Sequence, residues 1–341
     1  MITLAIETSC DETSAAVLSK EKVMSNIISS QLFHSKYGGV VPEVASREHL
    51  KKIIDITEES LLKAKTELKD IDLISATSEP GLIGALLVGL NFAKSLSVTL
   101  NKPFIPVNHI ESHLYSNFLC GQKNEFPFLG LIVSGGHTLL ILVEDFFKHK
   151  ILGRTIDDAA GEAFDKVAKL LSLGYPGGPE IDKYAKTGNK NFHKFPRANI
   201  KESEFDFSFS GIKTSVLYFL RKIDFHNVKN ETVINDICAS FQDAVISSLY
   251  QKTLEASEKY GVKIISVSGG VSANSGLREK FNSLRDKGYR VYFPEHEYST
   301  DNAAMVGLTA YLRYKYSKDK DFFYNDSLKQ NARARLDYEN F

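Results

Sequence analysis

Two histidines spaced four residues apart give the sequence its first candidate for chemistry. His109 and His113 flank Ile-Glu-Ser and follow the apolar run 104–107 directly. Residues four apart lie on one face of a helix, so both imidazoles could hold a single cation. Ordinary core or surface histidines at the same spacing are the alternative. The pair therefore predicts a metal site only if a third ligand joins it.

Asp301 is the best candidate for that third ligand. It follows Ser299 and Thr300 at the start of the last predicted helix. Clusters of Ser, Thr and Asp at this position usually cap the helix, which is the alternative. Two histidines and one carboxylate suit iron or zinc with open positions for substrate oxygens. The residue types do not choose between these two metals.

Glu111 argues against a zinc protease. That class places its general-base Glu immediately after the first histidine, in the order HExxH. Glu111 stands two positions after His109, which is about 200° around a helix of 3.6 residues per turn. Its side chain should therefore point away from the metal.

Three turns, each directly after an apolar strand, form the second candidate site. They are residues 7–13, residues 134–138 and residues 268–274, and the last two contain Gly-Gly pairs. Glycine lets backbone N–H groups approach a phosphate closely, and hydroxyl groups add further donors. A single turn of this kind is more often a plain hairpin. Three turns at matching places favour a nucleotide site.

The predicted elements occur twice in the same βββαβα order. The first set comprises strands at 3–7, 14–19 and 22–28, a helix at 42–65, a strand at 71–77, a helix at 82–100 and a strand at 104–107. The second comprises strands at 128–133, 138–143 and 151–154, helices at 160–171 and 234–259, a strand at 263–267, a helix after 274, a strand at 289–292 and a helix at 301–316. Within the helix at 42–65, Arg47, Glu48 and His49 are expected on an exposed face. The repetition predicts a duplicated α/β fold.

The duplication predicts two lobes. The N-terminal lobe should span residues 1–107 and be completed by the helix at 301–316, and the C-terminal lobe should span 108–300. Residues 174–229 are rich in Gly, Pro and Phe with weak periodicity, which indicates an insertion. Residues 317–341 form a polar, peripheral tail.

Composition bounds the class of protein. Apolar residues make up 43% and charged residues 25%, as in ordinary globular domains, and Lys plus Arg and Asp plus Glu both number 42. This balance argues against a polyanion-binding surface over the whole molecule. No run of about 18 apolar residues is present, and the first residues carry no basic leader, so no membrane is expected and a cytoplasmic protein is predicted. Cys10, Cys120 and Cys238 are scattered and predict free thiols.

Seven motifs resemble those of the TsaD family, whose members were earlier described as O-sialoglycoprotein endopeptidases. In order, from about residue 1 to 310, they are Ala5-Ile-Glu-Thr-Ser-Cys-Asp-Glu-Thr13, Gly38-Gly-Val-Val-Pro-Glu-Val-Ala-Ser-Arg-Glu-His49, Asn108-His-Ile-Glu-Ser-His113, Val133-Ser-Gly-Gly-His-Thr138, Asp157-Asp-Ala-Ala-Gly-Glu-Ala-Phe-Asp-Lys166, Tyr175-Pro-Gly-Gly-Pro179 and Gly269-Gly-Val-Ser-Ala-Asn274. The resemblance implies the two-lobed actin, sugar-kinase and Hsp70-like (ASKHA) fold, built from duplicated RNase H-like halves. It also implies one bound Fe²⁺, or Zn²⁺, and a ligand cleft between the lobes.

The resemblance also implies roles for individual residues. It places the metal on His109, His113 and Asp301, and it matches Asp11 and Glu12 to acids that serve the transfer. It places substrate contacts on Val133, Ser134, Gly135, Gly136, His137, Asp165, Gly178, Asp182 and Asn274. For Asp165 the alternative is a solvated helix face, and for Asp182 it is an acid in the first turn of a helix.

The implied activity is tRNA modification. The family transfers the threonylcarbamoyl group of threonylcarbamoyl-adenylate to N6 of the adenosine 3′ to the anticodon, in tRNAs that read codons beginning with A, and releases AMP. The implied partners are a TsaB-like paralogue and a TsaE-like ATPase, with a TsaC-like enzyme supplying the intermediate. The rival functions are a phosphotransferase of the same fold, a metalloprotease and a non-catalytic ATP binder.

One basic cluster is a candidate tRNA contact. It consists of Lys190, His193, Lys194, Arg197 and Lys201, interleaved with Phe192 and Phe195. A solvated loop is the alternative. In the same segment, Ala198 stands where relatives usually carry a second proline, which questions local rigidity more than chemistry.

Overall fold

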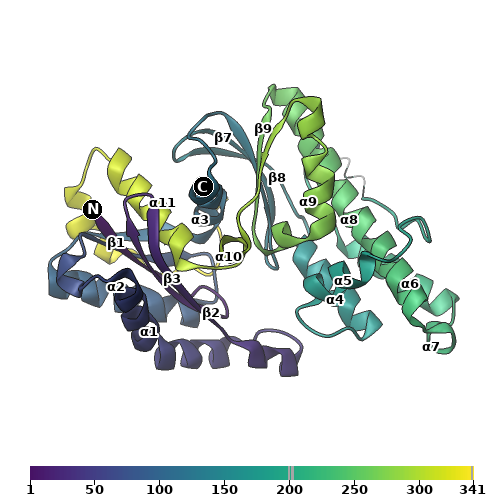
Figure 1. Ribbon diagram of the computed structural model, residues 1–341, viewed down its shortest axis with the longest axis horizontal. Helices are drawn as coiled ribbons and strands as arrows, with labels where there is room; N and C mark the ends of the chain where they lie inside the picture. The colour runs from purple at the N-terminus through teal and green to yellow at the C-terminus, as the bar shows by residue number, and fades with distance from the viewer. Residues whose placement is uncertain (199, 201–202, 339–340) are drawn as a thin grey trace. The chain divides into compact units, whose positions relative to one another are not determined.

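The computed structural model describes residues 1–341 except 199, 201–202 and 339–340. The chain forms two compact units, which we describe separately (Figure 1). Unit 1 comprises residues 1–124 and 294–341, and unit 2 comprises residues 125–293. Each unit is built on one five-stranded sheet.

The sheet of unit 1 has the strand order β3-β2-β1-β4-β5. The first three strands are antiparallel neighbours, and β4 and β5 join parallel to β1. Fully buried runs such as the end of β1 and the middle of β2 indicate that both faces are covered. The strands are β1 (Ile2–Glu7), β2 (Glu12–Ser19), β3 (Lys22–Ser30), β4 (Leu73–Glu79) and β5 (Phe104–Asn108).

Helices cover this sheet on two sides. On one face, α1 (Pro42–Ala64) and α2 (Ile83–Leu100) pack on the strands and on each other. On the other face, α11 (Ala303–Tyr316) contacts all five strands, and Gly307 lies against Ala5 and Leu18. The short helices of unit 1 are η1 (Leu32–Tyr37), η2 (Leu68–Asp70), α3 (His109–Tyr115), η3 (Ser116–Cys120), α10 (His296–Ser299), η6 (Asp321–Tyr324) and η7 (Ser327–Lys329).

The sheet of unit 2 repeats the arrangement. Its order is β10-β9-β6-β7-β8, with β6, β7 and β8 antiparallel and β9 and β10 added in parallel. Apart from direction of listing, this is the order of unit 1, so the predicted duplication is present. The strands are β6 (Phe128–Val133), β7 (Thr138–Asp145), β8 (Lys148–Arg154), β9 (Ile264–Ser268) and β10 (Arg290–Tyr292).

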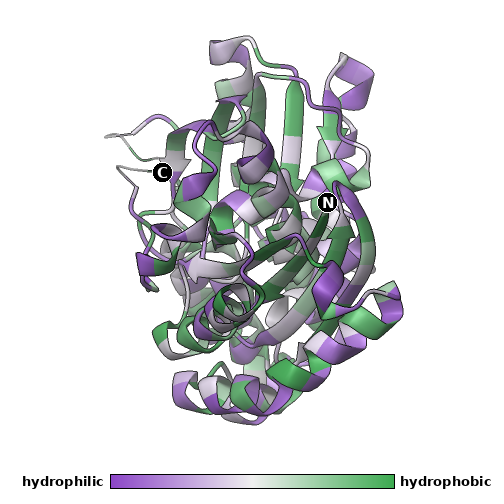
Figure 2. Ribbon diagram, turned by 90° about the vertical axis from the view of Figure 1, so that its left-hand side faces the viewer, coloured by the Kyte–Doolittle hydropathy of each residue, from purple (hydrophilic) through white to green (hydrophobic). Residues whose placement is uncertain are grey.

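The helices of unit 2 include three that the sequence patterns did not resolve. These are α5 (Gly177–Ala185), α6 (Ser210–Lys222) and α7 (Phe225–Val228), all within the segment interpreted as an insertion. Helices α5 and α6 pack on α4 (Ala160–Leu171) and on the long α8 (Glu231–Tyr260), and α7 packs on α6. The remaining helices are η4 (Gly270–Ala273), α9 (Ser275–Asn282) and η5 (Arg285–Lys287). Apolar side chains of these helices and of the strands form the core of the unit. Figure 2 shows mainly hydrophobic strands on the inside and helices of mixed hydropathy on the outside.

Two boundaries differ from the sequence-based domain limits. Residues 108–124 belong to unit 1 because α3 and η3 pack against α11, and residues 294–300 belong there as well. The polar tail is also less peripheral than its composition indicates. Phe323 and Leu336 are buried, and the Arg333 backbone N–H donates to the Ser78 carbonyl oxygen.

Helix α2 is an exception to the predicted absence of long apolar runs. Residues Ile83–Leu100 are long and apolar enough to cross a membrane by length and composition alone. In the structure α2 lies on the sheet of unit 1, with Leu86, Leu90 and Ala93 buried. The Lys94 ammonium in its second half donates to the Gln330 carbonyl oxygen of the tail.

Candidate functional site

Helix α3 carries the histidine pair on one buried face. The helix begins where the Asn108 side chain accepts hydrogen bonds from the backbone N–H groups of Ile110 and Glu111. This capping fixes the helical register from its first residue. His109 and His113 are both buried, and their rings meet edge to face with centroids 4.7 Å apart.

Asp301 reaches the same point from the other end of the sequence. Its Oδ1 lies 3.1 Å from His113 Nε2 and 3.4 Å from His109 Nε2. The predicted alternative, a helix cap, is wrong for this residue because Asn302 caps α11 by accepting from the Met305 N–H. One ligand atom each from His109, His113 and Asp301 lies within 4.8 Å of the others.

Glu7 belongs to this cluster, and the sequence patterns did not single it out. It is the last residue of β1 and is fully buried. Its carboxylate lies 3.2 Å from His109 Nδ1 and accepts hydrogen bonds from the Ser9 N–H and the Thr77 hydroxyl. Because a carboxylate can only accept, His109 Nδ1 donates to Glu7, and Nε2 is the ring nitrogen that faces Asp301. The only feature of the sequence that could have indicated Glu7 was its position as an acid at the end of an apolar strand.

The buried charges perturb one another strongly. Burial alone would lower the pKa of His109, but the carboxylates of Asp301 and Glu7 raise that pKa well above its usual value. Burial would raise the pKa of Asp301, but the two histidines lower it well below its usual value. Burial lowers the pKa of His113 and outweighs its hydrogen bond to Asp301. Two imidazoles thus share one carboxylate at the cation position.

The donor set fits a divalent metal ion. Two imidazole Nε2 atoms and a carboxylate oxygen converge, and His109 has the outer carboxylate partner typical of metal-binding histidines. Among the described residues His113 Nδ1 has no hydrogen-bond partner. Its Nε2 is therefore the only nitrogen of that ring with a defined contact, and that nitrogen faces Asp301. Three protein ligands leave coordination positions open for other oxygen atoms.

Asp11 lies in the turn between β1 and β2 of the same unit, and Glu12 is the first residue of β2. Glu12 interacts electrostatically with Asp301, Asp11 and Glu7, and together with burial these carboxylates raise the pKa of Glu12 well above its usual value. The turn is held from outside by the Gln31 N–H, which donates to the Asp11 carbonyl oxygen. Glu12 is thus close enough to the candidate metal centre to interact with Asp301, and a catalytic role for Asp11 or Glu12 stays a prediction.

His49 corrects one expectation. The sequence placed it with Arg47 on an exposed face of α1, but its side chain is fully buried, because it turns inward from the helix. Its Nδ1 lies 2.8 Å from the Thr13 hydroxyl oxygen, and its Nε2 lies 3.0 Å from the Cys10 carbonyl oxygen. His49 therefore supports the turn that carries Asp11 and Glu12.

Glu111 points away from the histidine pair, as its position on the helix predicts. Its carboxylate forms an ion pair with Arg313 of α11. A carboxylate engaged in this way is not placed to act on a metal-bound water, so the geometry does not support a zinc protease.

In unit 2 two glycine turns lie side by side. Strands β6 and β9 are parallel neighbours, so the turns that follow Val133 and Ser268 emerge at one edge of the sheet. Gly269 has φ of 87°, and a Cβ there would lie 2.5 Å from the Val133 carbonyl oxygen. A Cβ at Gly135, Gly136 or Gly270 would meet nothing within 4 Å. These open backbone segments leave room for a ligand.

The turn at residues 134–137 is closed by its own hydrogen bonds. The Ser134 N–H donates to the His137 carbonyl oxygen, and the His137 N–H donates to the Ser134 hydroxyl. The Gly161 N–H of α4 donates to the Ser134 carbonyl oxygen. The glycine turn is therefore fixed in place by both its strand and the neighbouring helix.

The other predicted substrate residues form a hydrogen-bonded series in unit 2. The Asp165 carboxylate accepts from the Gly177 N–H at the start of α5, so it does not lie on a solvated helix face. The Asp182 carboxylate accepts from the backbone N–H and hydroxyl of Ser275 at the start of α9. Asn274 caps α9 and donates to the Gln242 side-chain oxygen. Gly178 has open space where a Cβ would stand. The structure brings these residues together, and their contact with a substrate stays a prediction.

Solved structures of low sequence identity share the fold. Full-length HypF in a phosphate- and nucleotide-bound form aligns with a TM-score of 0.59 and 14% identity, over 93% of this chain and 56% of the HypF chain. The ROK hexokinase from Thermus thermophilus aligns with a TM-score of 0.50 and 12% identity, over 92% of this chain and 99% of the hexokinase. Together with the two sheets of the same strand order, these alignments confirm the predicted two-lobed ASKHA fold.

Proteins with much higher identity define the family. The model of the TsaD family, tRNA N6-adenosine threonylcarbamoyltransferase, matches residues 22–308. The transferase of that name from Kosmotoga olearia is 52% identical over 317 residues, covering 92% of this chain and 94% of the relative. The one from Clostridioides difficile is 52% identical over 328 residues, covering 95% of this chain and 96% of the relative. The chain therefore belongs to the TsaD family of tRNA-modifying transferases.

Proposed function

We propose that this chain transfers the threonylcarbamoyl group of threonylcarbamoyl-adenylate to N6 of the adenosine 3′ to the anticodon, in tRNAs that read ANN codons. AMP is the second product. The observation that carries this proposal is the convergence of His109, His113 and Asp301 in a chain that is half identical to curated transferases of this name. Membership of the family supports the substrates.

The reaction forms one bond and breaks another. The N6 nitrogen forms a bond to the carbamoyl carbon, the bond from that carbon to the phosphate oxygen of AMP breaks, and N6 loses a proton. The amine is a poor nucleophile because its lone pair is delocalised into the ring, whereas AMP is a good leaving group. Positioning is therefore the largest contribution that the protein can make.

His109, His113 and Asp301 would hold Fe²⁺, with Zn²⁺ as the alternative. A bound divalent ion supplies Lewis-acid polarisation of a carbonyl oxygen. Glu7 fixes the ring of His109 so that Nε2 faces the cation position. Two nitrogen ligands and one carboxylate support this class of metal without choosing between the two ions.

Asp11 or Glu12 accepts the proton from N6. Asp11 lies in the turn whose backbone His49 and Gln31 hold by hydrogen bonds, and Glu12 begins the strand that follows. Burial, and then Asp301 and Asp11, raise the pKa of Glu12, and this makes its carboxylate a stronger base than an ordinary Glu. A general base of this kind contributes about 10²–10⁴-fold to the rate.

The glycine turns of unit 2 hold the adenylate. Val133, Ser134, Gly135, Gly136 and His137 offer backbone groups to its phosphate, which the open space at the two glycines supports. Further contacts come from the hydrogen-bonded series described above, namely Asp165, Gly178, Asp182 and Asn274.

A TsaB-like paralogue binds the outer surface of α1 and α2. Leu50, Ile54 and Leu62 of α1 recur on one side of the helix and are 64%, 56% and 80% exposed. Ile83, Leu87 and Val98 of α2 are also exposed. Adjacent exposed apolar stripes of this kind mark protein interfaces. We call these six residues the apolar stripe.

The wider assembly follows from the family. A TsaE-like ATPase completes it, and a TsaC-like enzyme supplies the intermediate. The reaction takes place in the cytoplasm without a membrane, where its tRNA substrate is found.

Mass spectrometry of tRNA nucleosides tests the proposed activity. Unmodified tRNA is incubated with threonylcarbamoyl-adenylate, the chain and its partners, then digested. The wild type should yield N6-threonylcarbamoyladenosine, and the His109→Ala and His113→Ala double variant should not. His296→Ala, which removes an exposed histidine of the same unit, is the control and should retain full yield. A wild type that forms no product under any combination of partners contradicts the proposal.

A further inference from the structure

One segment of unit 2 concentrates positive charge in a chain that is neutral overall. Between Lys183 and Arg197 the sequence contains five Lys or Arg residues and no Asp or Glu. The whole chain, by contrast, has 42 residues of each sign. The segment runs from the end of α5 into the loop before α6. Local charge of this kind attracts a polyanion even when the net charge is zero.

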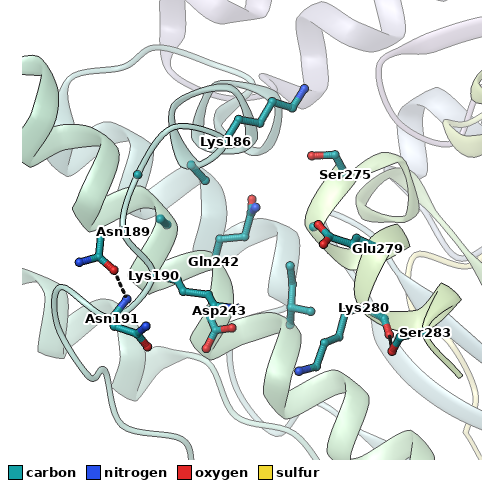
Figure 3. A pocket seen from close by; sticks show the side chains of 15 residues that line it. Lys186, Asn189, Lys190, Asn191, Gln242, Asp243, Ser275, Glu279, Lys280 and Ser283 are labelled. Atoms are coloured by element: carbon teal, nitrogen blue, oxygen red, sulfur yellow. Dashed lines mark hydrogen bonds between the residues drawn. The ribbon is translucent and has the colours of Figure 1, made fainter.

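The basic segment forms one wall of a groove of about 580 Å³ (Figure 3). Lys186 and Lys190 line it from the segment, and Lys280 lines it from α9 on another side. Gln242 and Asp243 of α8 lie between them. Asparagine and serine side chains contribute further hydrogen-bonding groups to the lining. We call this cavity the lysine groove.

The lysines of the groove are not engaged by protein acids. Within the described residues, Lys186, Lys190 and Lys280 form no ion pair, and all three are exposed. Elsewhere in unit 2 lysines do pair, as Lys166 does with Asp158 at 2.7 Å. Two acids line the groove, Asp243 and Glu279. The Asp243 carboxylate lies 4.0 Å from the Arg197 guanidinium, which balances its negative charge. The three lysines thus outnumber the remaining acid, Glu279.

The groove lacks the usual binding site for a single compact phosphate. Such a phosphate binds the backbone N–H groups at a helix N-terminus. At the start of α9 the Ser275 N–H and hydroxyl already donate to the Asp182 carboxylate. Cations on flexible side chains with amide and hydroxyl donors remain, and this combination suits successive phosphates of a backbone. Phe192 follows the lining residue Asn191 in the chain and is 40% exposed, so it offers an aromatic surface on which a base can stack.

We infer that the lysine groove binds the phosphate backbone of the tRNA substrate. This inference rests on the proposed function for the identity of the RNA. The groove supplies a local electrostatic contact that the neutral chain as a whole does not. Lys186 and Lys190 contribute from one side and Lys280 from the other.

Charge reversal tests this inference with a matched control. The groove variant is Lys186→Glu with Lys190→Glu. The control is Lys150→Glu with Lys263→Glu, because both are exposed lysines of unit 2 outside the groove and the net charge changes equally. The full-length chain is titrated with unmodified tRNA transcript at several salt concentrations. Each lost phosphate contact costs about tenfold in affinity at 0.1 M salt and reduces the salt slope by about one.

The groove variant should therefore bind tRNA about a hundredfold more weakly, with a salt slope lower by about two, while the control stays near wild type. Threonylcarbamoyl-adenylate binding should be unchanged in both. Equal tRNA affinity of the groove variant and the wild type overturns the inference, as does an equal loss in the control or a wild type that binds no tRNA. An acidic protein partner that binds the groove in place of RNA also overturns it. The proposed activity is judged separately, by nucleoside analysis of the wild type.

Discussion

At the scale of single residues, the orientation of one imidazole depends on a carboxylate outside the ligand set. Glu7 accepts a hydrogen bond from His109 Nδ1 and is held by the Ser9 N–H and the Thr77 hydroxyl. Three donors converge on one buried carboxylate, so its position is determined by the protein and not by the metal. His109 is therefore oriented before any ion binds.

Removal of the Glu7 carboxylate should weaken metal binding. Glu7→Gln keeps the size of the side chain, but its amide no longer selects the Nδ1-protonated ring as strongly. We expect metal affinity to fall about 10–100-fold, as for other outer carboxylate partners. Titration of the metal-free protein in competition with a chelator measures this. Glu111→Gln is the control, because Glu111 is an equally buried carboxylate paired with Arg313. Equal affinities of Glu7→Gln and wild type would show that the metal alone orients His109.

Two adjacent glycines should respond differently to alanine. A Cβ at Gly177 would lie 2.6 Å from the Ala168 Cβ and 2.7 Å from the Asp165 Cα, whereas a Cβ at Gly178 meets nothing within 4 Å. Gly177→Ala should lower the free energy of unfolding by about 1–3 kcal/mol through overpacking. Gly178→Ala should leave stability within about 0.5 kcal/mol but weaken adenylate binding. Urea denaturation and ligand titration separate the two effects, and unchanged adenylate affinity in Gly178→Ala would remove Gly178 from the site.

The sequence predicted the metal ligands better than their supports. His109 and His113 share a helix face, which spacing alone reveals, and Asp301 was the candidate third ligand because of its place at the start of the last predicted helix. Glu7 was not predicted to be functional, because an acid at the end of an apolar strand usually marks only the end of that strand. The burial of His49 was not predicted, because the charged residues next to it in α1 indicate an exposed face. Its burial depends on a tertiary contact with the turn that it supports.

At the scale of elements, α1 has two different faces. His49 points inward and holds the turn of Asp11 and Glu12, whereas Leu50 and Ile54 of the apolar stripe point outward. Neighbouring positions of one helix therefore connect a surface suited to a partner with the acids proposed for catalysis.

Charge on the apolar stripe should weaken binding of the paralogue. Leu50→Glu with Ile54→Glu introduces two acids at positions that are already exposed, so the free energy of unfolding should change by less than about 1 kcal/mol. Affinity for the TsaB-like partner should fall at least about tenfold, because charges at the centre of an apolar interface are poorly tolerated. Calorimetric titration measures the affinity. Lys51→Glu on the same helix is the control, and unchanged binding by the double variant would place the interface elsewhere.

The pH dependence of stability should reveal the buried state of His49. Burial lowers the pKa of His49 below its ordinary value of 6.5. A group whose folded pKa is depressed contributes stability above its unfolded pKa, and this is lost as pH falls through the folded pKa. The wild type should therefore lose more stability than His49→Gln as pH falls below about 6.5. Urea denaturation across that range measures it. Parallel pH profiles of the two proteins would show that folding does not lower the pKa of His49.

Regular elements were predictable where periodicity was strong. The strands and long helices lie within a few residues of their predicted bounds, and the helix at 160–171 matches α4. The helices within residues 174–229 were not predicted from the sequence. Helices α5 and α6 bury their apolar side chains against α4 and α8, and this tertiary contact leaves only a weak local pattern.

At the scale of the whole molecule, duplication separates the two halves of the proposed chemistry. Both sheets have one strand order, and each places a turn after its central strand. In unit 1 the turn after β1 carries acids beside the histidine pair. In unit 2 the turn after β6 carries open glycines. The same architecture thus presents a metal and acid site in one unit and a ligand turn in the other.

The order of the elements was enough to predict this duplication, but not the long-range contacts. His113 and Asp301 are 188 residues apart in the chain. Only the packing of α3 against α11 brings them together, and that packing is absent from local patterns. The burial of Phe323 in the tail is another such contact.

Metal dependence of the transfer tests the central claim most directly. The chain is stripped with a chelator, reloaded with Fe²⁺, and given threonylcarbamoyl-adenylate, tRNA and partners, and N6-threonylcarbamoyladenosine is quantified by mass spectrometry. We predict product from the reloaded wild type, loss of product in the stripped protein, and no recovery in Asp301→Ala. Full product from the stripped protein, or from Asp301→Ala, would contradict the assignment of His109, His113 and Asp301 as the metal centre of the reaction.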